Sequence, residues 1–271
     1  AGLWHGEAAA QTKRVSINLH GDMTMFGNTM GHDCRAGIPA PIVGTVNTAM
    51  CGNNTTDTAI DLHWQADTPT GGATANTTIT PTAARSTATL QLPPGVSVVN
   101  ARMYWSGQRA TADTTAIIDR PGAFSPVTVT ADSSATLSGT YYQSSADITA
   151  LIQRYGVGPY RVTDIDTTNL VDLNQDVTWQ NWSVIVIYQD NNLPARNLTI
   201  FDGLAQANMG GAVINSTLNG FLVPNAGFDG KLGFIGYDGD YDLTGDSLAF
   251  NGTNLSNATN PVDNILNGTR T

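Results

Sequence analysis

The stretch "WSVIVIYQD" at residues 182–190 is the strongest structural signal in the chain. It is rich in β-branched and aromatic residues, which favour strands, and it is too short to cross a membrane as a helix. A continuous apolar run of this length is typical of a strand that is covered on both faces. We therefore predict a central strand here.

Strand-like segments precede this run in the chain. "RVSINLH" (14–20) and "TAIDLHW" (58–64) alternate apolar and polar residues, which is typical of half-buried strands. "TATLQLPPGVSVVNARMYWSG" (87–107) predicts a strand, a Pro-Pro-Gly turn and a second strand.

Further strand-like segments follow it at turn-separated intervals. They are "NLTIFDGLA" (197–205), "AVINSTLNGFLV" (212–223) and "KLGFIGYDG" (231–239). Many short strands separated by turns are typical of β-sandwiches and jelly rolls. The sequence therefore predicts an all-β fold of this kind.

Two short helices are also expected. "SADITALIQRYG" (145–156) has apolar residues at helical spacing, with Ser145 as an N-cap and Gly156 as the stop. "NPVDNILNG" (260–268) begins with Asn and Pro and ends at Gly. The full prediction is thus a β-sandwich or jelly-roll-like fold with one or two short helices.

The composition is typical of an exported protein. Charged residues make up 13% of the chain, which is about half the usual share. The 22 acidic residues outnumber the 12 basic ones and give a net charge of −10, which argues against nucleic-acid binding. No apolar run is long enough for membrane insertion. We therefore expect an extracellular or cell-surface protein that was exported through a cleaved signal peptide.

The two cysteines, Cys34 and Cys51, lie in a stretch rich in Gly, Pro and Asn. They do not have the Cys-x-x-Cys spacing of a redox pair. In an exported chain they predict one disulfide that closes a short loop and stabilises the fold by roughly 3 kcal/mol.

The stretch "YDGDYDLTGDSLAFNG" (237–252) carries a cluster of carboxylates, Asp238, Asp240, Asp242 and Asp246. Calcium prefers such oxygen ligands. An EF-hand is excluded, because Leu243 and Ala249 stand where that motif needs Gly and Glu. The sequence favours the simpler interpretation that Asp and Gly form tight turns between strands here, with calcium as the alternative. Calcium is therefore a possible cofactor, and no cofactor is required.

The same stretch contains Ser247 within Gly-Asp-Ser-Leu, a tetrapeptide known from a family of esterases. In those enzymes the motif lies near the N-terminus of an α/β fold, and the histidine base follows it. Here all four histidines precede Ser247, and the predicted fold is all-β. We assign no catalytic residues and expect the protein not to be an enzyme.

Several segments resemble an N-terminal domain of large secreted bacterial surface proteins, which include myxobacterial proteins linked to gliding motility or adhesion. The most specific are "RNLTIFDG" (196–203) and "LTGDSL" (243–248), and the order of segments is kept from about residue 27 to residue 269. In those proteins the domain often precedes immunoglobulin-like repeats. The resemblance implies an extracellular structural or adhesive role and supplies no catalytic residues.

The chain divides into an N-terminal arm with the first strand, residues 1–26, and a single large β-sandwich domain, residues 27–271. The arm carries Trp4 and the alternating residues Val15, Ile17 and Leu19. Such an arm can add a strand to a neighbouring subunit, which would make the chain a self-assembling fibre subunit. The competing interpretation is an arm that folds onto its own domain. Expected partners are further copies of the chain or neighbouring surface-protein domains.

An alternative function is that of a calcium-assisted carbohydrate- or surface-binding jelly-roll module. In that case aromatic side chains such as Trp105, Trp179 or Tyr241 would contact a glycan ligand beside the calcium.

Overall fold

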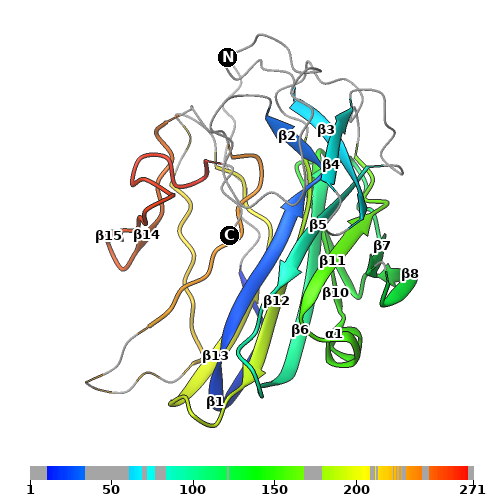
Figure 1. The fold of residues 1–271 in the computed structure, drawn as a ribbon. Helices are drawn as coiled ribbons and strands as arrows, with labels where there is room; N and C mark the ends of the chain where they lie inside the picture. Colours follow the sequence, from blue (N-terminus) through cyan, green and yellow to red (C-terminus); the bar gives the residue numbers. More distant parts are fainter. Residues whose placement is uncertain are drawn as a thin grey trace.

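The structure of the chain is a computed structural model. It describes residues 11–33, 61–68, 72–76, 84–120, 122–167, 179–207, 211, 213–221, 223, 225, 227, 230–239 and 244–267, with side chains in all of these except 31–33, 61–68 and 72–76. This part of the chain is mostly β, with antiparallel pairing dominant and one short helix, so the predicted all-β sandwich is confirmed (Figure 1).

In the described residues the strands form two main sheets. The first has the order β13-β1-β12-β6-β10-β9 and contains Ala195–Asp202, Thr12–Thr29, Gln180–Gln189, Ser97–Gln108, Tyr141–Asp147 and Ser133–Leu137. The second has the order β2-β3-β5-β11-β7-β8 with β4 paired to β3, and contains Gly31–Asp33, Asp61–Thr68, Arg85–Leu90, Gly158–Thr163, Thr115–Arg120, Phe124–Thr130 and Gly72–Asn76. A separate hairpin joins β14 (Ala249–Phe250) to β15 (Thr253–Asn254).

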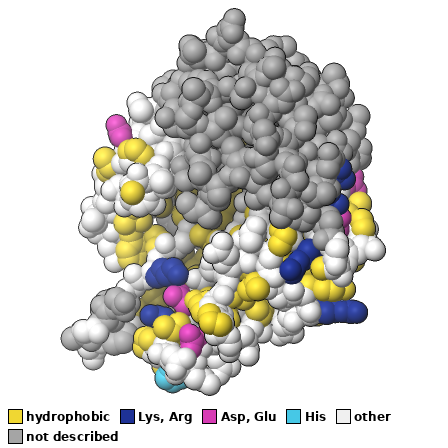
Figure 2. Space-filling model, viewed as in Figure 1, with side chains coloured by type: hydrophobic (Ala, Val, Ile, Leu, Met, Phe, Trp, Pro, Cys, Tyr) yellow, Lys and Arg dark blue, Asp and Glu magenta, His cyan; other side chains and the backbone are white. Residues whose placement is uncertain are grey.

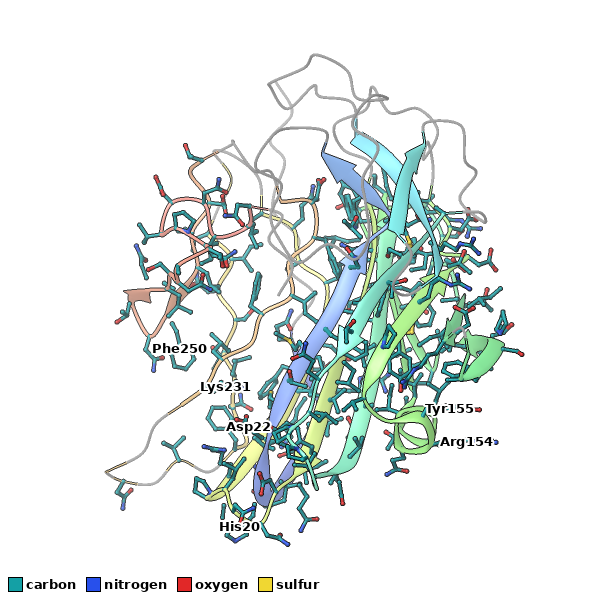
Figure 3. The ribbon with its side chains drawn as sticks, viewed as in Figure 1. His20, Asp22, Arg154, Tyr155, Lys231 and Phe250 are labelled. Atoms are coloured by element: carbon teal, nitrogen blue, oxygen red, sulfur yellow. The ribbon has the colours of Figure 1, made fainter. Side chains whose placement is uncertain are left out.

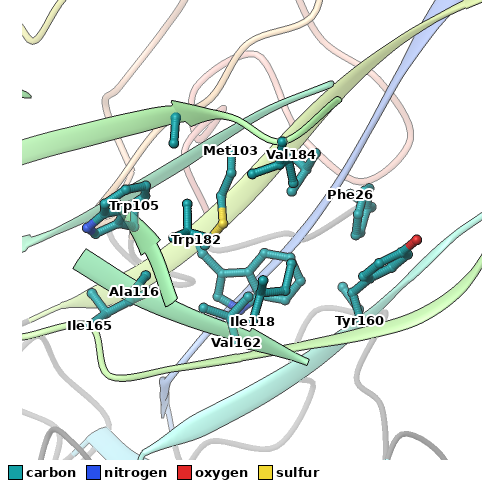
Figure 4. Close-up of a cluster of buried hydrophobic side chains, with 14 of the residues drawn as sticks. Phe26, Met103, Trp105, Ala116, Ile118, Tyr160, Val162, Ile165, Trp182 and Val184 are labelled. Atoms are coloured by element: carbon teal, nitrogen blue, oxygen red, sulfur yellow. The ribbon is translucent and has the colours of Figure 1, made fainter. Parts of the chain in front are cut away.

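The main core lies between these two sheets (Figure 4). From the first sheet, alternate residues such as Trp105, Trp182 and Val184 point inward and are fully or almost fully buried. From the second sheet, Ile118 and Tyr160 pack against them. Both buried indoles also find hydrogen-bond acceptors, because Trp182 donates to Ser86 and Trp105 donates to the carbonyl of Asp113.

The predicted central strand is confirmed as β12, which lies between β1 and β6. Its second face is also covered, because Ile187 is fully buried and Ile185 is partly buried there. These residues belong to a second apolar cluster, which also contains Tyr104, Leu198 and Ile200. The apolar run of residues 182–188 thus serves two clusters on opposite faces of one strand.

Strand β1 changes its partner at Gly21. Residues 12–20 pair with β13, whereas residues 21–29 pair with β12. A Cβ atom at Gly21 would collide with the carbonyl oxygen of Tyr188 and with the side chain of Leu19. Glycine therefore lets the chain come close to β12 where the sheet curls, and Figure 3 labels His20 and Asp22 on either side of this point.

The predicted alternation in the first strand is confirmed. Val15, Ile17 and Leu19 are half-buried, the residues between them are exposed, and all three pack against the second apolar cluster. Strand β1 runs without a break across the boundary expected at residue 26, and it pairs with strands of its own chain. Exchange of this strand between subunits stays a prediction.

The first predicted helix is confirmed as α1, Thr149–Tyr155, but its predicted N-cap is wrong. Ser145 lies in β10, where its hydroxyl accepts a hydrogen bond from Arg102. The carboxylate of Asp147 accepts the N–H of Thr149 instead. Gly156 ends the helix as predicted, with a φ of 64° and a hydrogen bond to Ile152.

The second predicted helix is wrong, because the described residues 260–267 form turns. The side chain of Asn260 donates to the carbonyl of Ile265 and to the side chain of Asn267. Such side-chain hydrogen bonds compete with those of a helix.

The strands predicted at 212–223 and 231–239 are also wrong, because the described residues of these segments lie outside any strand. Figure 1 shows the chain after β13 running as coil along the outer side of the first sheet. Lys231 contacts Asp22 and the carbonyl of Met23, and Ile235 packs on the second apolar cluster. The described residues 231–239 thus lie against a face of the first sheet.

Candidate functional site

A polar cleft lies where the curled first sheet brings its two ends together. Its volume is about 180 Å³, and it is lined by Thr12, Arg14, Ser133, Ala135, Gln143, Ser145, Asp202 and Gly203. These residues come from β1, β13 and the distant pair β9 and β10. The guanidinium of Arg14 donates to the hydroxyl of Ser133 at 2.9 Å, which connects the start of β1 directly to β9.

Asp202 is the centre of this cleft. Its side chain is 8% exposed and accepts hydrogen bonds from Arg14 at 2.7 Å and from the hydroxyl of Tyr104 at 3.2 Å. The hydrogen bond to Asp202 raises the pKa of Arg14, against the opposing effect of burial. Burial, helped by the charge of Asp202, raises the pKa of Tyr104, so that its phenol stays a donor at neutral pH. The carboxylate is therefore held by one charged partner and, with the hydroxyl of Thr12 at 3.4 Å, by two neutral ones.

A second ion pair lies beside the cleft. Arg102, on β6, pairs with Asp132, and it also donates to Ser145 at 2.8 Å. Burial opposes the ionisation of Asp132, but the hydrogen bonds from Arg102 and from the N–H of Asp147 outweigh it and lower the pKa of this carboxyl. The guanidinium is almost completely buried, with 7% of its side chain exposed. Its partner is thus ionised throughout the neutral range.

An aromatic pair continues the same face. The rings of Tyr141 and Trp179 lie 4.7 Å apart at 31°, and the indole of Trp179 donates to Ser106. Tyr141, Gln143 and Ser145 alternate along β10 and share one face. Gln143 lines the cleft and donates to the hydroxyl of Tyr237 at 2.9 Å. The cleft and the aromatic pair therefore form one continuous polar and aromatic surface.

Asp238 lies close enough to this surface to act on it electrostatically. The pKa of Tyr141 is raised first by burial and then by the charge of Asp238, while a hydrogen bond with Gln206 opposes the shift. Asp238 has a left-handed φ of 57° in an exposed turn, a conformation that Asp tolerates better than most residues.

The predicted calcium ligands are only partly described. Asp240 and Asp242 lie outside the described residues. Asp246 accepts the N–H of Leu266 at 2.6 Å, so its carboxylate fastens residues 244–250 to the end of the described chain. No group of three or more His, Cys, Asp or Glu side chains gathers within the described residues. The calcium site stays a prediction.

The stretch around Ser247 leads into a tight hairpin. Ser247 itself is exposed, and β14 and β15 follow it, joined by Asn251 and Gly252 with φ values of 48° and 79°. Two successive positive φ values are typical of a type I′ turn, for which Asn-Gly is a preferred sequence. That dipeptide was the signal by which the hairpin could have been predicted.

Other predicted site residues have different outcomes. Cys34, Cys51, Trp4 and Tyr241 lie outside the described residues, so the disulfide and the role of Trp4 stay predictions. Trp105 is fully buried in the main core and offers no surface to a ligand. Trp179 alone of the three suggested aromatic residues is described at the surface, where it is half-buried against Tyr141.

Comparison with known proteins finds no relative of the chain: no family model, no curated protein and no solved structure matched it. In the part of the chain that the structure describes, there is no helix long and apolar enough to span a membrane.

Proposed function

We propose that the chain is a non-enzymatic extracellular protein with a structural or adhesive role at a bacterial cell surface. The observation that carries this proposal is that the buried carboxylates bind partners within the protein. Among the described residues these are Asp113, Asp119 and Asp202. Asp119 pairs with Arg161, Asp202 pairs with Arg14, and Asp113 accepts the N–H groups of Thr115 and Asp166.

Asp119 and Asp202 hold strands to one another, and Asp113 ties the loop before β7 to the segment after β11. A general acid or base must instead have an oxygen that is free to exchange a proton with a substrate. The low charge content and the β-sandwich fold agree with the same role, because exported structural domains rely on strand pairing and polar uncharged surfaces. The resemblance to bacterial surface proteins points in the same direction.

The assembly that we propose is a fibre in which subunits exchange β1. This strand supplies pairing partners for both β12 and β13. Its replacement by the same strand of a neighbour would keep every one of these contacts and would join two subunits at low energetic cost. Val15, Ile17 and Leu19 would then fill the second apolar cluster of the neighbour.

A disulfide trap tests this exchange. Ser16 and Thr199 are paired across β1 and β13, and their hydroxyl oxygens lie 3.2 Å apart at an exposed position. The double variant Ser16→Cys and Thr199→Cys, oxidised under mild conditions, should give covalent multimers on a non-reducing gel if β1 is exchanged. A cross-linked monomer would contradict exchange. Each single variant is the control for unrelated thiol chemistry.

Negative-stain microscopy of the full chain tests the structural role itself. Regular filaments are expected, and they should disappear on dilution only if the subunits are held by reversible contacts. Dispersed single particles at every concentration would contradict the fibre and leave a monomeric adhesive domain.

A second candidate function is glycan binding, favoured by the Tyr141 and Trp179 pair beside Asp238. Aromatic faces next to amides and carboxylates are typical of ligand sites. Trp179→Ala should abolish any binding on a glycan array, and EDTA should do the same if calcium takes part. Tyr155→Ala is the matched control, because Tyr155 stacks on Phe124 at 4.3 Å in a second aromatic pair.

A further inference from the structure

Two segments of the coil that follows β13 lie outside any helix or strand, residues 213–221 and 231–237. Both belong to the stretches whose pattern predicts strands. In the second segment Ile235 and Tyr237 are half-buried, whereas Phe234 and Gly236 are exposed. A period of two residues is the alternation of an extended chain with one face on the protein.

The main chain of both segments lacks the inter-strand hydrogen bonds of a ladder, although the sequence of both stretches predicts strands. Among the described residues, neither 213–221 nor 231–237 makes a hydrogen bond from main chain to main chain. Lys13 donates to the carbonyl of Gly220, and the side chain of Asn215 contacts the carbonyl of Val213 at 3.5 Å. Main-chain N–H and C=O groups that make no hydrogen bond within the described residues are groups with which another extended chain can pair.

Large apolar side chains of the same segments face outward. Val213 is 83% exposed, Leu232 is 47% exposed and Phe234 is 50% exposed. Figure 2 shows hydrophobic side chains in patches over the described part of this face. Exposed apolar residues beside unmade main-chain hydrogen bonds are the two features of a strand that is open to pairing.

The charge distribution indicates which partner fits. The chain carries a net charge of −10, so two copies repel each other over most of their surface. Residues 213–221 contain no charged side chain, and 231–237 contain only Lys231, which pairs with Asp22 at 3.3 Å. This is a surface on which two like-charged copies can meet, and each copy brings the extended peptide that the other needs.

We propose that residues 213–221 and 231–237 bind the same segments of a second copy of the chain by main-chain strand pairing. The inference rests on the self-association put forward above, and it is independent of the exchange of β1. The pairing converts coil into strand, and it covers Val213, Leu232 and Phe234.

Hydrogen exchange tests the main-chain part. The amides of 213–221 and 231–237 should exchange fast in dilute protein and become protected at concentrations where the wild-type chain assembles. Sedimentation velocity supplies the assembly state at each concentration. Assembly without protection of these amides would overturn the inference and leave self-association standing. A wild-type chain that stays monomeric would overturn both.

A pair of variants tests the side-chain part. Leu232→Asp with Phe234→Asp should weaken association at least about tenfold, because two apolar contacts are replaced by like charges. Val127→Asp with Val157→Asp is the matched control, with exposed fractions of 44% and 51% and the same change in charge. Association that falls equally in both variants would contradict the inference, because net charge alone would then explain it.

Discussion

The side chains of Arg14 and Asp202 form an ion pair at 2.7 Å, although 188 positions separate them in the chain. The pair joins the first described strand to the last strand of the first sheet, and Tyr104 adds a third strand to the contact. The ion pair links the neighbouring strands β1 and β13, whereas the hydrogen bonds of Arg14 to Ser133 and of Tyr104 to Asp202 span the curl of the sheet beside the polar cleft.

Asp202→Asn should lower the free energy of unfolding by about 2 kcal/mol, because it leaves a partly buried guanidinium without its counter-charge. Urea unfolding at neutral pH measures the change. Asp166→Asn is the control, since its pair with Arg109 has about a third and a half of the two side chains exposed and should contribute less than about 1 kcal/mol. Equal losses in the two variants would contradict the special role of Asp202.

Alkaline pH should destabilise the protein through its buried tyrosines. Burial raises the pKa of Tyr104 above its ordinary value of 10.0, and burial raises the pKa of Tyr142 and Tyr237 in the same direction. Below pH 10 the phenols are protonated in both the folded and the unfolded state, so their contribution to the free energy of unfolding is fully present. Above about pH 10 only the unfolded state ionises, and the free energy of unfolding falls.

Tyr104→Phe checks this assignment. Urea unfolding measures the free energy of unfolding at about pH 8 and about pH 11. Its decrease between the two pH values should be smaller in the variant than in the wild type, because one phenol with a raised pKa has been removed. At neutral pH the variant should be less stable by about 1 kcal/mol, since Asp202 loses a hydrogen bond. An unchanged difference between the two pH values would argue that Tyr104 ionises freely in the folded protein.

Gly21→Ala should destabilise the protein by about 2 kcal/mol, because the added methyl group meets the carbonyl of Tyr188 and forces β1 away from β12. Thermal unfolding followed by circular dichroism measures this effect. Gly230→Ala is the matched control, because a Cβ there meets nothing within 4 Å and Gly230 has no positive φ. A variant at position 21 as stable as that control would show that the curl does not depend on glycine.

Ser247→Ala should change neither stability nor any ester hydrolysis detected in the purified protein, because Ser247 is exposed in the approach to a hairpin. Asp246→Ala should cost about 1 kcal/mol, since the N–H of Leu266 loses its acceptor. Hydrolysis of a p-nitrophenyl ester and urea unfolding give the two readouts. Loss of hydrolysis in the serine variant alone would revive an esterase function.

Local signals predicted the parts of the fold that depend on neighbouring residues. The apolar run of β12, the alternation of β1 and the glycine stop of α1 are all readable within one segment. The segments 212–223 and 231–239 have an equally good strand pattern. Their described residues lie outside any strand. A ladder needs a partner edge, and the sequence of one segment does not say whether an edge is near.

The candidate site was beyond sequence reasoning for a similar reason. Arg14 and Asp202 meet because the first half of β1 pairs with β13, and Tyr141 meets Trp179, which directly precedes β12. The aspartate-rich stretch 237–252 suggested a metal site because its carboxylates are close in sequence. In the described part of that stretch Asp246 holds another segment, whereas the buried carboxylates Asp119 and Asp202 pair with arginines that are distant in sequence.

The pairing of β1 also sets an order of events during synthesis. Residues 12–29 are made early, but their partners at 181–189 and 195–202 are made much later. Contacts of such long sequence separation form slowly, since a large loop must close first. A newly made chain therefore carries an apolar, alternating and unpaired strand for most of its synthesis. Until residues 181–202 of the same chain are made, the only β12 and β13 that can pair with it are those of another copy.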